Sequence, residues 1–297
     1  HKRGIGMVFQ NYALFPHMTV YENLAFPLRV RKIPKDEADK KIDKALSMVS
    51  LKGFEARMPM QLSGGQQQRV AVARALVFDP QVVLMDEPLG ALDKNLRESM
   101  QYEIKHIHES IGVTVVYVTH DQGEALTMSD RVAVMNEGEL EQVGLCDDVY
   151  DFPNTPFVAT FVGENNPFYA KVISSDGDIV KVESEGNTFL AKSGKLDDKN
   201  KHTFNKGDEV FMFIRPESIF LNNQNNKLDN NFVGKVNTIE FEGNLKNIYL
   251  SINSNMNVRF SVPNAVDTSE LSQNKKVELT FSSEKAVVLP KGSLAVD

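Results

Sequence analysis

Apolar residues recur at helical spacing in two stretches of the first half of the chain. After Pro34 they fall three or four residues apart, a spacing that places them on one face of an α-helix. A second stripe begins near Lys94, and Gly112 is placed to end that helix because glycine readily adopts the left-handed conformation of a helix C-terminus. The pattern predicts two amphipathic helices. Their apolar stripes are Ala38, Ile42, Leu46 and Val49 in the first, and Leu96, Met100, Ile104, Ile107 and Ile111 in the second.

Short, continuous apolar runs lie between the helical stretches. Residues 6–9, 82–85 and 113–118 are such runs, and the last two flank the helix that begins near Lys94. Continuous apolar runs are typical of strands in a parallel sheet covered by helices. The order strand, helix, strand predicts a parallel pair joined by a right-handed crossover. We therefore predict an α/β domain.

The helical spacing disappears after Gly163. Strand-like stretches, such as residues 210–214 and 276–281, are separated there by Gly, Asn and Asp. We predict two domains, an α/β domain over residues 1–163 and a small all-β domain over residues 164–297.

Composition and charge limit the partners of such a protein. The 297 residues are 41% hydrophobic and 25% charged, which is ordinary for globular domains, and the net charge is −7. An acidic chain lacks the positive field that gathers nucleic acid, so we expect no nucleic-acid partner. No apolar run approaches the roughly 18 residues that span a bilayer. The chain begins with His1, and its first apolar run has no element before it, so we expect N-terminal residues to be missing.

The segment Leu62 to Gln66, of sequence LSGGQ, precedes a helical run. Ser63 and Gln66 have the spacing of a capping box, so local rules alone already predict a helix start here. Gly64 and Gly65 add a second property. Without side chains they leave backbone N–H groups open to an anion at the positive end of the helix dipole. The segment is therefore a candidate phosphate contact.

Two carboxylates follow the apolar run of residues 82–85. Asp86 and Glu87 stand at the C-terminal end of a predicted parallel strand, where open α/β sheets place their ligands. Two carboxylates alone favour a solvated acidic turn, but the serine-glycine helix start upstream favours a nucleotide site. We predict that Asp86 holds Mg²⁺ through water and that Glu87 orients and deprotonates the water that attacks a γ-phosphate.

Polar side chains also end the other two predicted strands. His120 follows the run 113–118, and Gln10 follows the run 6–9. A lone histidine at a strand end is more often structural than catalytic. Adjacent parallel strands, however, would bring His120 and Glu87 to one edge of the sheet, within reach of a common phosphate. Gln10 would join them as a neutral ligand that touches metal or water.

These motifs occur in the order found in one family of ATPases. Gln10, Leu62–Gln66, Asp86–Glu87, Leu89–Asp93 and His120 follow one another as they do in ABC transporter ATPases. The chain resembles the ATPase subunits of the importers for maltose, polyamines, ferric iron and sulfate, and the resemblance covers nearly all of it.

The resemblance implies a role for each motif. Gln10 lies in the Q-loop, Asp93 is the D-loop aspartate and His120 is the switch histidine. The signature residues Ser63, Gly64, Gly65 and Gln66 contact the ATP held by the opposite subunit. The segment after Gln10, with Tyr12, Phe15 and His17, resembles the surface that receives the membrane subunit, provided that its aromatic side chains are exposed.

One motif of the family does not occur in these residues. The glycine-rich phosphate-binding loop, Walker A, should precede Gln10, and no such sequence is present. We expect the 297-residue chain alone to hold its own nucleotide poorly and to be inactive. Residues 164–297 resemble the OB-like regulatory domain, of the TOBE type, that these importers carry, with Ile214 to Glu217 as its arginine-proline-glutamate turn.

The resemblance implies an ATP-hydrolysing subunit that energises import, with ATP and Mg²⁺ as cofactors. It implies a homodimer peripheral to the cytoplasmic face of the plasma membrane, bound to permease subunits and acting indirectly with an external solute-binding protein. Residues 125–131, 157–165 and 287–289 look most like polyamine importers. The alternatives are a sugar, ferric iron or sulfate importer, a non-transport ABC ATPase, and a non-catalytic regulatory fragment. The non-transport class carries long coiled coils or a tandem second ATPase domain, which this sequence lacks.

Overall fold

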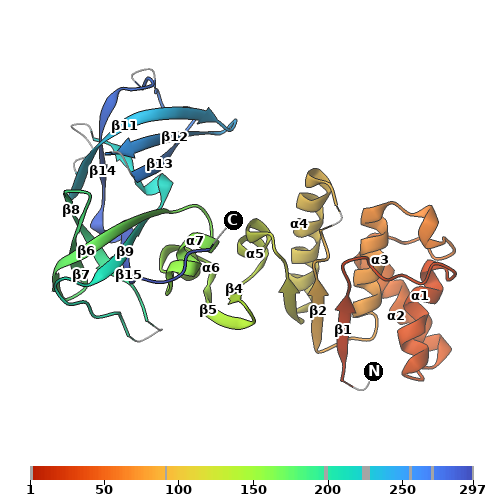
Figure 1. Cartoon of the computed structure of the whole chain (residues 1–297). Coiled ribbons are helices and arrows are strands. Elements are labelled where there is room, and N and C mark those ends of the chain that lie inside the picture. The colour runs from red at the N-terminus through yellow and green to blue at the C-terminus, as the bar shows by residue number, and fades with distance from the viewer. Residues whose placement is uncertain are drawn as a thin grey trace. The chain divides into compact units, whose positions relative to one another are not determined.

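The computed structural model divides the chain into two compact units, His1–Ser129 and Asp130–Asp297, and each is described here by itself (Figure 1). The structure describes residues 3–90, 92–196, 200–222, 228–253, 256–268 and 271–295. Among the described helices, none combines the length and the apolar character that a membrane crossing requires.

A parallel sheet forms the centre of the first unit. Its strands are β1 (Ile5–Val8), β2 (Val82–Asp86) and β3 (Thr114–Val118), in that order across the sheet. Val8 pairs with Met85, and Asp86 pairs with Val118, so the three strands run parallel and end at nearly the same level. The predicted α/β domain with a parallel sheet is confirmed, and the loops that follow the strands meet at one edge.

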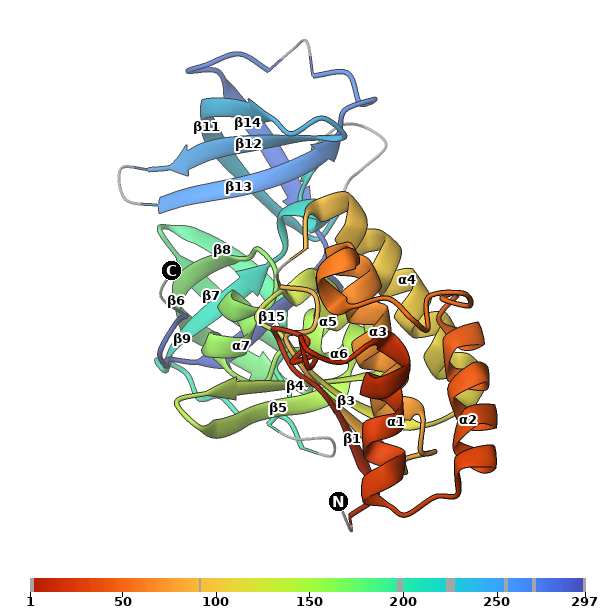
Figure 2. The ribbon, with the colours of Figure 1, turned by 90° about the vertical axis from the view of Figure 1, so that its right-hand side faces the viewer.

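Five α-helices accompany this sheet among the described residues of the first unit. The helices are α1 (Val20–Val30), α2 (Lys35–Met48), α3 (Gly64–Leu76), α4 (Lys94–Ile111) and α5 (Gln122–Met128), and a 3₁₀ turn, η1 (Pro59–Gln61), precedes α3. The helices α1, α2 and α3 pack against one another (Figure 2). Both predicted amphipathic helices are present. Helix α2 buries Ala38, Ile42 and Leu46, and α4 buries Met100 and Ile104 and ends at Gly112 with φ of 68°.

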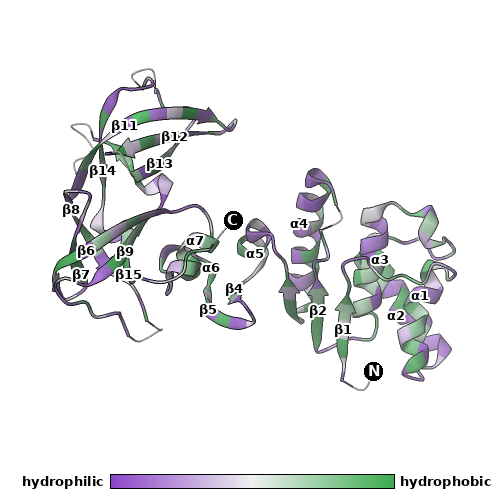
Figure 3. Cartoon of the chain, in the orientation of Figure 1, coloured by the Kyte–Doolittle hydropathy of each residue, from purple (hydrophilic) through white to green (hydrophobic). Residues whose placement is uncertain are grey.

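Helix α3 lies directly against β1. A Cβ atom at Gly6 would meet the carbonyl oxygen of Ala75 well inside van der Waals distance, so only glycine allows this approach. One face of the sheet joins α3 and α4 in an apolar core that includes Val8, Val83 and Met85. The opposite face carries exposed apolar residues such as Met7 and Val116, and Figure 3 shows the apolar character of β1 and β2.

The second unit is rich in β-structure. It begins with a hairpin of β4 (Arg131–Asn136) and β5 (Glu139–Leu145), followed by two short helices, α6 (Cys146–Asp151) and α7 (Pro156–Phe161). A closed barrel follows, formed in spatial order by β15 (Ala286–Pro290), β8 (Asn187–Ser193), β7 (Ile179–Ser184), β6 (Asn166–Asp176) and β9 (Glu209–Ile214). A five-stranded sheet contains, in spatial order, β10 (Phe220–Leu221), β14 (Lys276–Phe281), β11 (Asn230–Phe241), β12 (Leu245–Ile252) and β13 (Met256–Pro263). The 3₁₀ turns η2 (Pro216–Ser218) and η3 (Ser283–Lys285) complete the unit.

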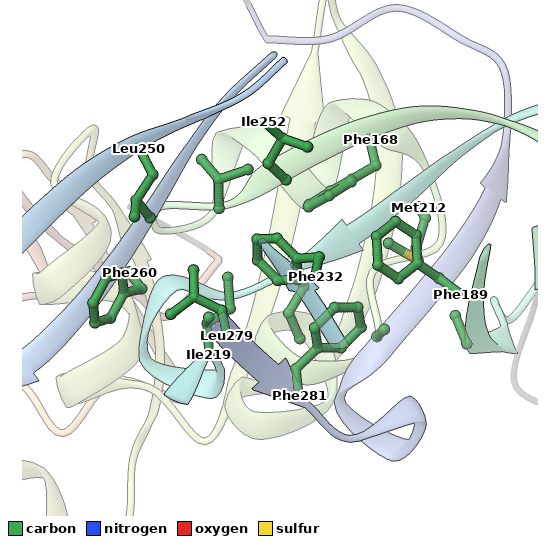
Figure 4. Packing of buried hydrophobic residues seen from close by; sticks show 14 of the residues in the cluster. Phe168, Phe189, Met212, Ile219, Phe232, Leu250, Ile252, Phe260, Leu279 and Phe281 are labelled. Atoms are coloured by element: carbon green, nitrogen blue, oxygen red, sulfur yellow. The ribbon is translucent and has the colours of Figure 1, made fainter. Parts of the chain in front are cut away.

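One apolar core joins the barrel and the five-stranded sheet (Figure 4). Aromatic rings dominate it: Phe168 and Phe189 meet edge to face with their centroids 5.5 Å apart, and Phe232 and Phe281 pack beside them. Such ring pairs stabilise a core beyond the area they bury. The predicted small all-β domain is confirmed.

The predicted division after residue 163 differs from the division of contacts, which falls between Ser129 and Asp130. The physical reason lies in Arg215, which is 5% exposed. Its guanidinium donates to the carbonyl oxygens of Val162 at 2.6 Å, Glu164 at 2.9 Å and Tyr150 at 2.6 Å. The sequence pattern assigned the helices α6 and α7 to the α/β domain. The hydrogen bonds from Arg215 instead tie the segment that contains them to the barrel. The limit of the ATPase domain at residue 163 stays a prediction.

Candidate functional site

Two side chains, from the ends of β1 and β3, meet the carboxylate of Glu87. Glu87 follows β2 directly, and its Oε2 accepts a hydrogen bond from Nε2 of Gln10 at 2.9 Å. Its Oε1 lies 3.0 Å from Nδ1 of His120. Both carboxylate oxygens are therefore engaged, one by a neutral amide and one by an imidazole. The structure brings together the three residues for which the sequence predicts catalytic roles.

The backbone of Glu87 is held in an uncommon conformation. Its φ is 43°, in the left-handed region that residues with a side chain rarely adopt. Its N–H donates to the carbonyl oxygen of Val118 at 2.9 Å, and its own carbonyl accepts from the N–H of Gly90 at 3.2 Å. Such a conformation persists only where the surroundings fix it, and it is common at functional sites. Here it directs the carboxylate toward the ends of the neighbouring strands.

His120 is an exposed histidine with a perturbed pKa. The hydrogen bond to Glu87, followed by the negative charge of Glu87, raises the pKa of His120 above its ordinary value. The imidazole is 75% exposed, so solvent and a ligand can both reach it. When Nδ1 donates to Glu87, Nε2 remains for another partner. His120 and Glu87 can therefore share a proton while one imidazole nitrogen faces a further partner.

A buried carboxylate fixes the loop that carries His120. Glu124 is 4% exposed and accepts hydrogen bonds from the hydroxyl groups of Tyr117 at 2.8 Å and Thr119 at 3.0 Å. Burial and the bond to Glu124 raise the pKa of Tyr117. Arg97, from the first turn of α4, lies 3.7 Å from Glu124 and donates to the carbonyl oxygen of Leu92 at 3.0 Å. Sequence reasoning missed Glu124 and Arg97, because no local pattern marks a residue that acts across two elements.

The signature segment starts α3 as its sequence predicts. Ser63 is the N-cap, its N–H donates to Oε1 of Gln66 at 3.0 Å, and its Oγ accepts from the N–H of Gln66 at 3.4 Å. Gly64 is exposed, whereas Gly65 is buried, and a Cβ atom on Gly65 would lie 3.1 Å from Leu96. In the part of the chain that the structure describes, no hydrogen bond joins Ser63–Gln66 to Gln10, Glu87 or His120.

The two predicted aspartates have different surroundings. Asp93 is the N-cap of α4, and its Oδ1 accepts from the N–H of Leu96 at 3.0 Å. Asp86 ends β2 with an exposed side chain, which leaves its carboxylate open to water or metal. Within the described ranges, no three His, Cys, Asp or Glu side chains form a metal-binding group. Ala91, which belongs to the motif between Leu89 and Asp93, lies outside the described residues.

The predicted docking segment needs a correction at Tyr12. Its side chain is only 9% exposed because it packs into the core between the sheet and the helices, so it is not part of an open surface. His17 is exposed, and Phe15 is half-buried with its ring 4.8 Å from that of Phe26. Asn23 holds the segment, since its side chain accepts from the N–H of Phe15 and donates to the carbonyl oxygens of Phe15, Met18 and Thr19. Phe26, which is 39% exposed, was not predicted, because no local pattern marks it.

Two family models match parts of this chain. A family model described as ABC transporter matches residues 1–90, and one described as TOBE domain matches residues 212–289. The solved structure of cbiO1 from Clostridium perfringens, described as part of the ABC transporter complex cbiONQ, is 32% identical, with a TM-score of 0.47 over 50% of this chain and 59% of that one.

Two curated relatives are import proteins. The spermidine/putrescine import ATP-binding protein PotA of Clostridioides difficile is 43% identical over 274 residues, which are 92% of this chain and 75% of that protein. The protein of the same name from Acidothermus cellulolyticus is 57% identical over 74% of this chain, but the match spans only 56% of its own length. The chain belongs to the ABC transporter family, among the ATP-binding proteins related to those of spermidine/putrescine import.

Proposed function

We propose that this chain is the ATP-hydrolysing subunit of an ABC importer and that the imported solute is a polyamine. The observation that carries the enzymatic part is the engagement of both oxygens of Glu87, by Gln10 and by His120, at the edge where the three strands end. The polyamine part is supported by the relatives, which are named for spermidine and putrescine import.

In the proposed reaction Glu87 is the general base. It orients the attacking water opposite the leaving phosphate and accepts its proton as the bond to the γ-phosphorus forms. His120, through its free Nε2, would donate to an oxygen of the γ-phosphate, where negative charge develops. Gln10 would place the water through its amide while holding Glu87 in the position seen here.

Oxygen-bearing side chains at the ends of β1 and β2 are of a type that suits a magnesium ion. The exposed carboxylate of Asp86 and the amide oxygen of Gln10 are oxygen donors, which Mg²⁺ prefers, and water would complete the coordination. When bound, Mg²⁺ neutralises phosphate charge. The assignment of Asp86 and Gln10 to this ion is part of the proposal.

The same proposal extends to the partners. Ser63 to Gln66 would contact the ATP of a second copy of the subunit, because the backbone N–H groups of the first turn of a helix suit a phosphate and Gly64 in that turn is exposed. Asp93 would act at that dimer interface. Permease subunits would dock near Phe15 and His17 at the cytoplasmic face of the plasma membrane, and the external solute-binding protein would act through them. The ATPase domain would span residues 1–163 and the regulatory domain residues 164–297.

Uptake by cells tests the transport assignment. Deletion of the gene should abolish uptake of radiolabelled spermidine or putrescine, and the wild-type gene should restore it. The matched control is a gene that carries Glu87→Gln, which should not restore uptake although the protein is made. Unchanged polyamine uptake together with lost uptake of sugar, iron or sulfate would contradict the polyamine assignment.

A further inference from the structure

Arg74 reaches from the last turn of α3 to the segment that follows Gln10. Its Nη1 donates to the carbonyl oxygen of Ala13 at 2.7 Å, and its Nη2 donates to that of Tyr12 at 2.8 Å. One planar guanidinium thus holds two successive carbonyl groups, a geometry that a single ammonium group cannot reproduce. The proposed reaction described above does not use this residue.

The segment that Arg74 holds has an uncommon backbone. Tyr12 has φ of 59° and Ala13 has φ of 46°, so two successive residues with side chains adopt the left-handed conformation. Such residues occur there singly far more often than in succession, and they need surroundings that fix them. The two hydrogen bonds from Arg74 end on the carbonyl groups of these same two residues.

The charge of Arg74 has no acidic partner in the described ranges. Removal from water lowers its pKa, and no carboxylate offsets the effect. The guanidinium also lies over the ring of Phe15, whose centroid is 5.9 Å from its carbon atom. By contrast, Arg69 on the same helix forms an ion pair with Glu103. The guanidinium of Arg74 instead donates its hydrogen bonds to the backbone carbonyl groups of Tyr12 and Ala13.

The chain contacts one turn of α3 both before and after Gln10. Before it, Gly6 of β1 packs against the backbone of Ala75. After it, Tyr12 and Ala13 are held by Arg74. Because Arg74 and Ala75 are neighbours, the two contacts fix both sides of Gln10 relative to the helix whose first turn is the signature.

We propose that Arg74 is a positioning residue that keeps the amide of Gln10 on Glu87 by fixing the backbone of Tyr12 and Ala13. It thereby links α3, and with it the signature segment, to the catalytic carboxylate. The inference deepens the proposed function and rests on it, since one of its two readouts is ATP turnover.

A double-mutant cycle in the subunit expressed from its complete gene, assembled with its permease subunits, tests this link. Arg74→Met should lower turnover roughly tenfold or more, because small displacements of catalytic groups have large effects on rate. The same substitution in a Gln10→Ala background should lower turnover no further, because Arg74 acts through Gln10. Arg74→Lys should recover part of the loss. Arg69→Met is the matched control, and its effect should be equal in both backgrounds.

Hydrogen exchange provides a readout that does not depend on catalysis. Amide exchange in residues 11–15 should be faster in Arg74→Met than in the wild type, and unchanged in Arg69→Met. Equal losses of turnover from Arg74→Met in both backgrounds, or unaltered exchange in residues 11–15, would overturn the inference. If Arg74→Met does not fold, Arg74→Gln takes its place in both measurements. The exchange result stands whether or not the protein proves to be an ATPase, so the two proposals fail separately.

Discussion

At the scale of single residues, the contacts of Glu87 support its proposed role as the general base. Gln10 and His120 each take one oxygen, and the left-handed backbone of Glu87 fixes where the carboxylate lies. A general base acts efficiently only within hydrogen-bond reach of the proton that it removes. The neighbours restrict Glu87 to one position while the exposed imidazole leaves the site open to a ligand.

The titration of His120 tests this arrangement. Because the hydrogen bond and charge of Glu87 raise its pKa, the NMR titration midpoint of His120 should lie above the ordinary value of 6.5. In Glu87→Gln the midpoint should fall toward that value. The native pKa is raised, so the contact stabilises the fold below the unfolded-state pKa, and this contribution is lost as pH rises through the raised pKa. Equal midpoints in the two proteins would contradict the contact.

At the scale of elements, the close contact of β1 and α3 positions the loop that carries Gln10. Gly6→Ala should place a Cβ atom against the backbone of Ala75, which cannot yield as a flexible side chain would. Forced overpacking of this kind costs about 1–3 kcal/mol in the free energy of unfolding.

The matched control for Gly6→Ala is Gly112→Ala. Gly112 has φ of 68° and open space around it, so the added methyl group contacts no neighbour. The only cost of Gly112→Ala is the strain of a left-handed backbone in a residue with a side chain. Urea unfolding measures both variants. The account requires Gly6→Ala to lose more stability than Gly112→Ala, and an equal or smaller loss would show that the contact between β1 and α3 is loose.

Periodicity was enough to predict the elements that carry the site. The stripes of α2 and α4 and the apolar run of β2 are local patterns, and the parallel order implies that Gln10, Glu87 and His120 share an edge. The burial of Tyr12 could not be predicted, because an aromatic residue in a loop has no local signal of burial. Arg74 binds a segment far from it in the sequence, and Arg97 and Glu124 meet from two different helices, so only the folded chain identifies these contacts.

At the scale of the whole molecule, the proposal requires two copies to close on ATP. Glu87 would then act on the nucleotide of its own subunit and Ser63 on that of the partner, so changes at the two residues should stop turnover by different routes. Ser63→Arg places a bulky cation at the positive end of α3, which opposes the helix dipole and blocks the approach of a phosphate. It should leave ATP bound to open subunits.

ATP turnover of Glu87→Gln, measured with the dimer fraction from light scattering in Mg-ATP, tests the central claim most directly. The protein is the subunit from its complete gene, assembled with its permease subunits, and Ser63→Arg is the comparison. Glutamine keeps the size of the side chain but cannot accept a proton, and proton transfer contributes roughly 10²- to 10⁴-fold in rate. The account predicts that turnover falls at least about a hundredfold while the closed dimer persists. Near-normal turnover, or loss of ATP-dependent closure as in Ser63→Arg, would contradict the assignment of Glu87 as the general base.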